Sequence, residues 1–308
     1  TANSPLSPLE AINAHKAYGY GLSGVGQVIA IVDSSFNSQH QELDSKTPIT
    51  FGTIGSATPS SYHGLAVASI AAGEADGTGL QGVAPAANLH LSDYTYYGGE
   101  THLPNRWAAL TNDAASNNAI AQNNSWGIDY MMSSLQADIQ TANVSNAQGM
   151  AQKLTSGSYK ADAASINAYV QALDNFQKKG VVVYAVSNTE SFSDADFQAA
   201  MPELFPELSE AWLAAIDIEP PNTNNNLKHT RESAPCGSTA AYCLGADGTN
   251  IKTASYQTNS TSSYALNVSG TSFVAPQVSG AIALLAEAFP NHTPAQLTDR
   301  LLASANND

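Results

Sequence analysis

Three residues far apart in the chain, Asp33, His63 and Ser272, carry side chains that together could perform nucleophilic hydrolysis. A serine hydroxyl is a weak nucleophile until a histidine removes its proton and a carboxylate orients that histidine. Taken alone, Asp33 is most simply a carboxylate that caps the end of a strand, and His63 is most simply a histidine in a loop. Together, in the order acid, histidine, serine, they favour a catalytic triad.

The segment 268–280, VSGTSFVAPQVSG, surrounds the candidate nucleophile Ser272. Gly270 lets the backbone come close to a substrate, and Pro276 is tolerated near the start of a helix. Apolar residues then recur at helical spacing, at Val274, Val278, Ala281, Leu284 and Leu285. The pattern predicts a helix over 271–289 with Ser272 at its N-terminus, where free N–H groups stabilise negative charge.

The elements that must position these residues alternate between apolar strands and helices, which predicts an α/β fold with a mainly parallel sheet. Asp33 ends an apolar run typical of a buried parallel strand, and His63 precedes a small-residue helix. We expect one domain over 1–308, with a polar insertion, helical or an extended surface segment, at about 130–165 and a loop at 219–230. The predicted strands are 27–33, 88–93, 120–125, 181–187, 214–218 and 251–254, and the predicted helices are 9–17, 63–73, 104–118, 162–179, 271–289 and 294–304.

From about residue 10 to its end the chain resembles the subtilisin-like serine proteases (subtilases, peptidase family S8). The three segments above carry the resemblance, with GVAP at 82–85, NSWG at 124–127 and VVVYAVSN at 181–188. It implies a three-layer α/β/α fold and a serine endopeptidase that acts on proteins or peptides through an acyl-enzyme on Ser272. It also implies an oxyanion donor at Asn188 and substrate-binding residues at Ser125, Trp126, Gly127, Val186 and Ser187.

A narrower resemblance, to the passenger protease domains of bacterial subtilase autotransporters, rests on MPELFPEL at 201–208, WLA at 212–214 and the cysteine pair. It implies a secreted or cell-surface protein. The first residues lack a signal-peptide pattern, so an exported protein would be present here in processed form. Whether a translocating domain follows is left open.

Three residues depart from the family pattern: Ser35 and Ser187 replace glycines, and Leu65 replaces a threonine. Ser187 lies in the backbone that lines the specificity pocket, so it bears on substrate preference. The departures support one rival interpretation, a catalytically inactive subtilase-fold binding domain. An α/β-hydrolase esterase is excluded, because it requires a Gly-x-Ser-x-Gly elbow and the order Ser, Asp, His.

The pocket for the residue before the scissile bond would lie between 125–127 and 185–188. Trp126 and Val186 favour an apolar or aromatic occupant. The acids Glu190, Asp194 and Asp196 leave room for a basic one. The sequence leaves this choice open.

Amino-acid composition limits which other classes of function this chain could have. A net charge of −15 argues against binding to nucleic acid or anionic lipid and would favour cationic or neutral substrates, although solubility alone also explains it. With 43% apolar and only 12% charged residues the chain is a folded globular protein. No apolar run is long enough to span a membrane. We expect a monomer.

Cys236 and Cys243 are the only two cysteines, and a disulfide between them is favoured over two free thiols. A disulfide implies an oxidising compartment. No cofactor is needed for the chemistry, and the spacing of the histidines argues against zinc. Subtilases often bind structural calcium, and Glu42 stands where the family often has a calcium-binding acid; the alternative for Glu42 is a surface carboxylate.

Overall fold

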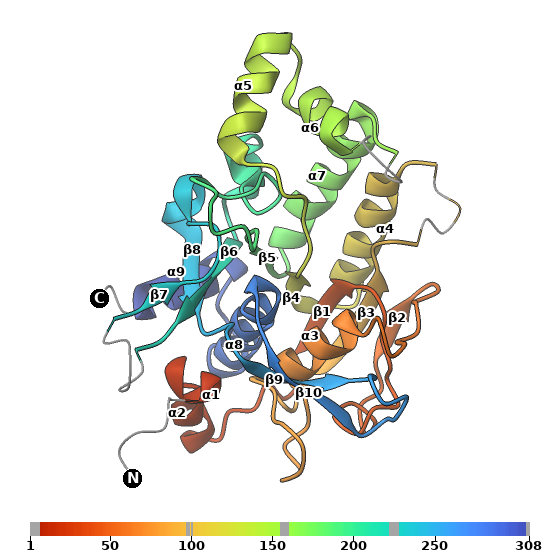
Figure 1. The fold of residues 1–308 in the computed structure, drawn as a ribbon, viewed down its shortest axis with the longest axis vertical. Coiled ribbons are helices and arrows are strands. Elements are labelled where there is room, and N and C mark those ends of the chain that lie inside the picture. Colours follow the sequence, from red (N-terminus) through yellow and green to blue (C-terminus); the bar gives the residue numbers. More distant parts are fainter. Residues whose placement is uncertain (1–6, 97–98, 100, 155–159, 222–227, 306–308) are drawn as a thin grey trace.

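The centre of the molecule is a mainly parallel sheet (Figure 1). The structure is a computed structural model that describes residues 7–96, 99, 101–154, 160–221 and 228–305. In these residues the strand order is β2–β3–β1–β4–β5–β6–β7, with β8 also beside β6, and only the β6–β7 pair is antiparallel. The strands are β1 (Val28–Asp33), β2 (Ile49–Phe51), β3 (Asn88–Asp93), β4 (Ala119–Asn124), β5 (Val181–Ala185), β6 (Trp212–Glu219), β7 (Thr230–Arg231) and β8 (Cys243–Ala246).

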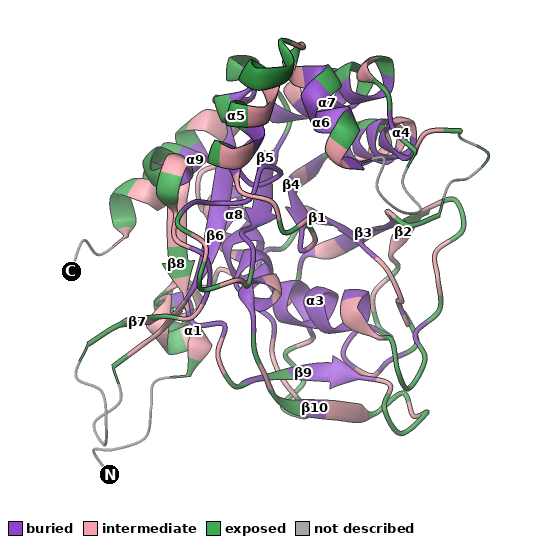
Figure 2. Ribbon diagram, turned by 45° about the horizontal axis from the view of Figure 1, so that its top comes forward, coloured by how far each residue is buried: buried purple, intermediate pink, exposed green. Residues whose placement is uncertain are grey.

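Helices cover both faces of this sheet, which gives the predicted three-layer α/β/α arrangement. Along β1, Ile29 and Ile31 pack into one apolar cluster, and Ala30 and Val32 pack into the other. A strand that is apolar on both sides is typical of a sheet buried between two helical layers. Figure 2 shows the central strands and α3 and α8 as almost wholly buried. One layer holds α3 (His63–Ala72) and α8 (Ala275–Ala288), and the other holds α4 (Leu103–Ser116) and α7 (Ala163–Gln177).

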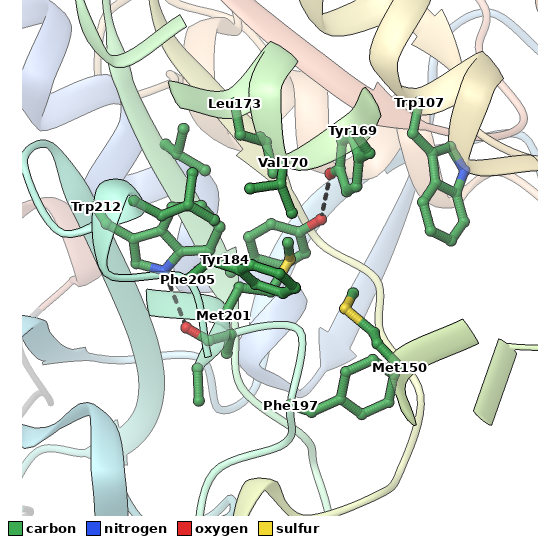
Figure 3. Packing of buried hydrophobic residues seen from close by; sticks show 14 of the residues in the cluster. Trp107, Met150, Tyr169, Val170, Leu173, Tyr184, Phe197, Met201, Phe205 and Trp212 are labelled. Atoms are coloured by element: carbon green, nitrogen blue, oxygen red, sulfur yellow. Dashed lines mark hydrogen bonds between the residues drawn. The ribbon is translucent and has the colours of Figure 1, made fainter. Parts of the chain in front are cut away.

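An aromatic cluster fills the core on the α4–α7 side (Figure 3). The hydroxyls of Tyr169 and Tyr184 are 2.6 Å apart, and Trp212 donates its indole N–H to the carbonyl of Ala199 at 2.9 Å. These bonds satisfy the polar atoms of side chains that are otherwise buried in apolar surroundings. The cluster therefore supports the end of β5, which leads into the candidate site.

Two predicted helices are each divided in the structure. The predicted helix 9–17 is split into α1 (Pro8–Ala11) and α2 (Ala14–Gly19), because Asn13 has a left-handed backbone with φ of 60°. The predicted helix 271–289 begins instead with a 3₁₀ turn, η4 (Thr271–Phe273), followed by α8. Ser272 therefore lies in the turn that precedes the α-helix. The prediction for α9 (Pro294–Ser304) is confirmed.

The predicted strand 251–254 does form, but outside the central sheet. It is β9 (Ile251–Ser255), which pairs antiparallel with β10 (Ser263–Val268), a strand that the sequence did not indicate. Between 130 and 165 the chain forms α5 (Met132–Ala142) and α6 (Asn146–Leu154) and begins α7; residues 155–159 of that predicted insertion lie outside the described residues. So do residues 222–227 of the predicted loop.

Three more short 3₁₀ helices, η1 (Met201–Glu203), η2 (Pro206–Leu208) and η3 (Gly237–Tyr242), lie in the connections around β6. Cys236 and Cys243 flank η3 and form the predicted disulfide, with their Cα atoms 5.9 Å apart. The bond closes a short loop and fixes the start of β8 beside β6.

Candidate active site

The predicted catalytic and substrate-binding residues meet around one cavity of about 350 Å³ at the carboxyl ends of β1, β4 and β5. Active sites of open α/β sheets form at this edge, because the loops that leave parallel strands converge there. The lining includes Asp33, His63, Ser125, Trp126, Gly127, Val186, Ser187, Asn188 and Ser272.

Asp33 and His63 form a direct pair. Nδ1 of His63 lies 2.8 Å from Oδ1 and 3.0 Å from Oδ2 of Asp33. The Asp33 side chain is 2% exposed at the end of β1, whereas the His63 side chain at the start of α3 is 40% exposed. A carboxylate at Nδ1 assigns the proton of the neutral imidazole to that nitrogen. Nε2 is then free to accept a proton.

Gly64 brings the two residues of this pair together. Its N–H donates to the carbonyl of Ser34 at 2.7 Å, which ties the first turn of α3 to the loop after β1. A Cβ at this position would lie 2.5 Å from that carbonyl oxygen. Only glycine allows so close an approach, so the His-Gly sequence has a geometric reason.

The pKa of His63 is raised above its ordinary value. Burial lowers it, but the charge of Asp33 and the hydrogen bonds to Asp33 together outweigh burial. The pair therefore favours the imidazolium that would form if His63 took a proton.

Ser272 is held against the end of β4 by two reciprocal hydrogen bonds. Its Oγ donates to the carbonyl of Ser125 at 3.2 Å, and Oγ of Ser125 donates to the carbonyl of Ser272 at 3.0 Å. Among the described residues no hydrogen bond joins Ser272 to His63. Catalytic hydrogen bonds are often long or poorly aligned in substrate-free sites and tighten when the substrate binds.

Asn188 is oriented by the residue next to the candidate nucleophile. Its Oδ1 accepts the backbone N–H of Thr271 at 2.9 Å and the Thr271 hydroxyl at 3.0 Å. This assignment leaves the Nδ2 donor available beside the cavity. Gly270, with φ of +141°, makes the arrangement possible, because a Cβ there would lie 3.0 Å from Oδ1 of Asn188.

Trp126 is chiefly a packing residue. It is half-buried, stacks on Tyr94 with ring centroids 4.6 Å apart, and contacts Trp107 at 4.7 Å. Tyr94 also lines the cavity, and no sequence pattern marked it as a candidate. The two rings form a rigid wall beside the exposed Gly127.

The three departures from the family pattern have structural consequences. Ser35 has φ of 66°, a conformation that costs a non-glycine residue about 1 kcal/mol, and its hydroxyl lies 2.7 Å from that of Ser61. Leu65 is fully buried in the apolar cluster between α3 and the sheet. Ser187 donates its hydroxyl to Asp129 at 2.6 Å. Asp129 lines the cavity and was not singled out from the sequence, although it stands two residues after Gly127.

Glu42 lies away from the cavity, in a buried position. It is 2% exposed, so its interpretation as a surface carboxylate is wrong. Oε1 accepts the N–H of Leu80 at 3.0 Å and the Tyr264 hydroxyl, while the buried Oε2 has no hydrogen-bond partner. Burial raises the pKa of this carboxyl. A single unpartnered carboxylate oxygen is compatible with a cation ligand, but the described residues contain no cluster of three or more acidic, histidine or cysteine side chains that could hold a metal.

The fold and the cavity define an α/β protein with an acid–histidine pair, a serine and an asparagine at one sheet edge. The sequence profile of the subtilase family matches residues 24–308, and the chain belongs to this family. In the described residues no helix is long and apolar enough to cross a membrane.

Two bacterial proteins share about a quarter of their residues with this chain over the matched regions. The chain is 26% identical to an extracellular serine protease of Serratia marcescens, over 94% of this chain and 30% of that protein. It is 25% identical to serotype-specific antigen 1 of Mannheimia haemolytica, over 65% of this chain and 19% of that protein. The chain therefore spans less than a third of these relatives.

The fold also matches a solved structure. Fervidolysin of Fervidobacterium pennivorans, a keratinolytic enzyme related to subtilisin, superposes with a TM-score of 0.64 at 20% identity. The match covers 97% of this chain and 42% of that one. It confirms the subtilisin-like fold.

Proposed function

We propose that this chain is a serine endopeptidase that cleaves peptide bonds through an acyl-enzyme on Ser272. The observation that carries the proposal is the Asp33–His63 hydrogen-bonded pair in the same cavity as Ser272 and Asn188. Membership of the subtilase family supports it.

In the first half-reaction, Nε2 of His63 takes the proton of Ser272 as Oγ attacks the carbonyl carbon of the scissile bond. Asp33 stabilises the resulting imidazolium, consistent with the raised pKa of His63. The developing oxyanion would accept hydrogen bonds from Nδ2 of Asn188 and from the backbone N–H of Ser272. This N–H belongs to the first turn of η4, where it has no partner within the helix.

His63 then donates its proton to the leaving amine, the C–N bond breaks, and the acyl group stays on Ser272. Water attacks this ester in the second half-reaction, with His63 again as base. Deacylation releases the carboxylic acid and restores the Ser272 hydroxyl. All of the groups that move a proton belong to the protein, and no cofactor is required.

Backbone groups of 125–127 offer an edge to which an extended peptide can add. Gly127 is exposed, and a side chain there would be within 3.3 Å of Asp196. We therefore expect binding through the peptide backbone, with the cavity selecting one side chain.

A fluorophosphonate probe tests the proposal directly. Modification of Ser272 in the folded protein, with no modification of Ser272→Ala, is the expected result, together with loss of casein hydrolysis in the variant. A folded parent protein that resists labelling would support instead the inactive binding domain.

We also propose that the protein acts outside the cell or at its surface. The Cys236–Cys243 disulfide supports an oxidising compartment. One relative is named an extracellular serine protease and another a serotype-specific antigen. Detection of the protein in culture medium or on intact cells, against a cytoplasmic marker, tests this location.

A further inference from the structure

Two carboxylates that share one serine line the cavity: Asp129, which is exposed, and Asp196, which is buried. Asp129 accepts the Ser187 hydroxyl at 2.6 Å, and Asp196 accepts the Ser187 backbone N–H at 2.7 Å. Both carboxylates line the same cavity as Ser272. Ser187, one of the three departures from the family pattern, thus connects two negative charges in the region expected to select the residue before the scissile bond.

Neither charge is neutralised within the described part of the chain. Asp196 is 1% exposed and accepts hydrogen bonds only from neutral backbone N–H groups, those of Ser187 and Ala199. No ion pair of the described residues includes Asp129 or Asp196. Burial raises the pKa of Asp196 to about 6, as expected for a carboxylate that lacks a cation.

A third polar side chain, that of Gln198, lies near Gly127 but does not line the cavity. Gln198 is 1% exposed, and neither its Oε1 nor its Nε2 has a hydrogen-bond partner. At the position that a Cβ of Gly127 would occupy, the nearest atoms are Oδ2 of Asp196 at 3.3 Å and Oε1 of Gln198 at 3.6 Å. The Gln198 amide lacks both a donor and an acceptor partner and does not line the cavity, so only the two aspartates point to a bound cation.

The two apolar residues that favoured an apolar occupant, Val186 and Trp126, give weaker support for it. Val186 is buried, and Trp126 is engaged by Tyr94 and Trp107. An apolar occupant would leave the buried carboxylate of Asp196 without a counter-charge, which is unfavourable for an ionised group at 1% exposure.

We propose that this cavity binds a lysine or arginine side chain as the residue before the scissile bond, with Asp129 and Asp196 as its counter-charges. The inference rests on the proposed peptidase function and names its substrate class. The net charge of −15 would also attract basic segments of a substrate.

Peptide substrates that differ only in this residue test the preference. Citrulline is the neutral counterpart of arginine, and norleucine is that of lysine. We expect kcat/KM to be at least about tenfold higher for arginine than for citrulline, and for lysine than for norleucine, because the basic side chain would pair with Asp196, a carboxylate that is 1% exposed. Highest kcat/KM for phenylalanine or leucine, or equal values for arginine and citrulline, would overturn the proposal.

Two variants assign the effect to the pocket. Asp129→Asn keeps the shape and should reduce the arginine-to-citrulline ratio several-fold. Glu190→Gln removes the same charge from an exposed residue that does not line the cavity, and it should keep the parent ratio. An unchanged ratio in Asp129→Asn, or an equal loss in both variants, contradicts the assignment.

Fluorophosphonate titration of Ser272 separates this proposal from the one on which it rests. Labelled protein without a preference for basic residues refutes the pocket assignment alone. Folded protein that cannot be labelled refutes the peptidase function.

Discussion

The backbone N–H of Thr271 donates to Oδ1 of Asn188 at 2.9 Å, which fixes the amide that faces the candidate nucleophile. Two segments 83 residues apart in the chain are joined by this contact. The orientation of Nδ2, the proposed oxyanion donor, thus depends on the residue before Ser272.

Asn188→Asp separates the two roles of Asn188. Aspartate keeps an oxygen that can accept the Thr271 N–H but replaces the Nδ2 donor with a second, negatively charged oxygen. We expect kcat to fall by about 10²–10³, a magnitude borrowed from the corresponding residue of subtilisin, with little change in KM. Steady-state kinetics on one peptide measure both values, with the melting temperature as a control for folding. A parent-like kcat would remove Asn188 from the mechanism.

The pH dependence of kcat/KM should report His63. The proposed base must be neutral, so activity should rise with pH through a pKa above 6.5, the ordinary value from which that of His63 is raised. The same shift means that the protonated pair stabilises the fold at low pH, and that this contribution is lost as pH rises through the folded-state pKa. A profile that stays flat between pH 5 and 9 would contradict the role of His63.

The Asp33→Asn variant tests whether Asp33 orients His63. Loss of the carboxylate removes both effects that raise the pKa of His63 and also the acceptor that fixes its tautomer. We expect kcat to fall by about 10⁴, as known for the orienting acid of such triads, while fluorescence and melting temperature show a folded protein. A loss of less than tenfold would mean that Asp33 does not orient the base.

Reduction of the Cys236–Cys243 bond should destabilise the protein modestly. The bond lowers the conformational entropy of the unfolded chain. For so short a loop this stabilises the folded protein by about 2–3 kcal/mol. Ser272→Ala protein, used to prevent self-cleavage, should therefore melt a few degrees lower with dithiothreitol than without it. The Cys236→Ser/Cys243→Ser variant should melt at the lower temperature in both buffers. Equal melting of all samples would show that the disulfide adds no stability.

Calcium is predicted to stabilise the protein through Glu42, whose buried Oε2 lacks a partner. At a free concentration of 100 Kd a bound ion adds about 2.7 kcal/mol to the free energy of unfolding. The melting temperature of Ser272→Ala protein should rise when calcium is added after EDTA treatment. Glu42→Gln should abolish this rise, whereas Glu74→Gln, at a half-buried neighbouring carboxylate, should keep the response to calcium. Absence of any calcium effect on the parent would reject the site.

Local sequence was enough to predict the elements that hold the three candidate catalytic residues. The apolar run before Asp33, the small-residue segment after His63 and the apolar spacing after Ser272 each indicated the element that forms. The errors in the predicted helix bounds were local as well. A left-handed backbone at Asn13 splits one predicted helix, and a 3₁₀ turn precedes the α-helix in another. Such boundaries depend on single backbone angles, which side-chain periodicity does not specify.

Which residues share the candidate active-site cavity was decided only by the tertiary structure. Asp129, Ser187 and Asp196 carry no common motif, and they meet because the ends of β4 and β5 lie side by side. Glu42 was likewise indistinguishable from a surface acid until the fold buried it. The sequence by itself determined the candidate reactive groups and most of the strands and helices that carry them, because these follow from residue type and periodicity. The electrostatics around those groups depend on contacts between distant segments, which form only when the sheet is assembled.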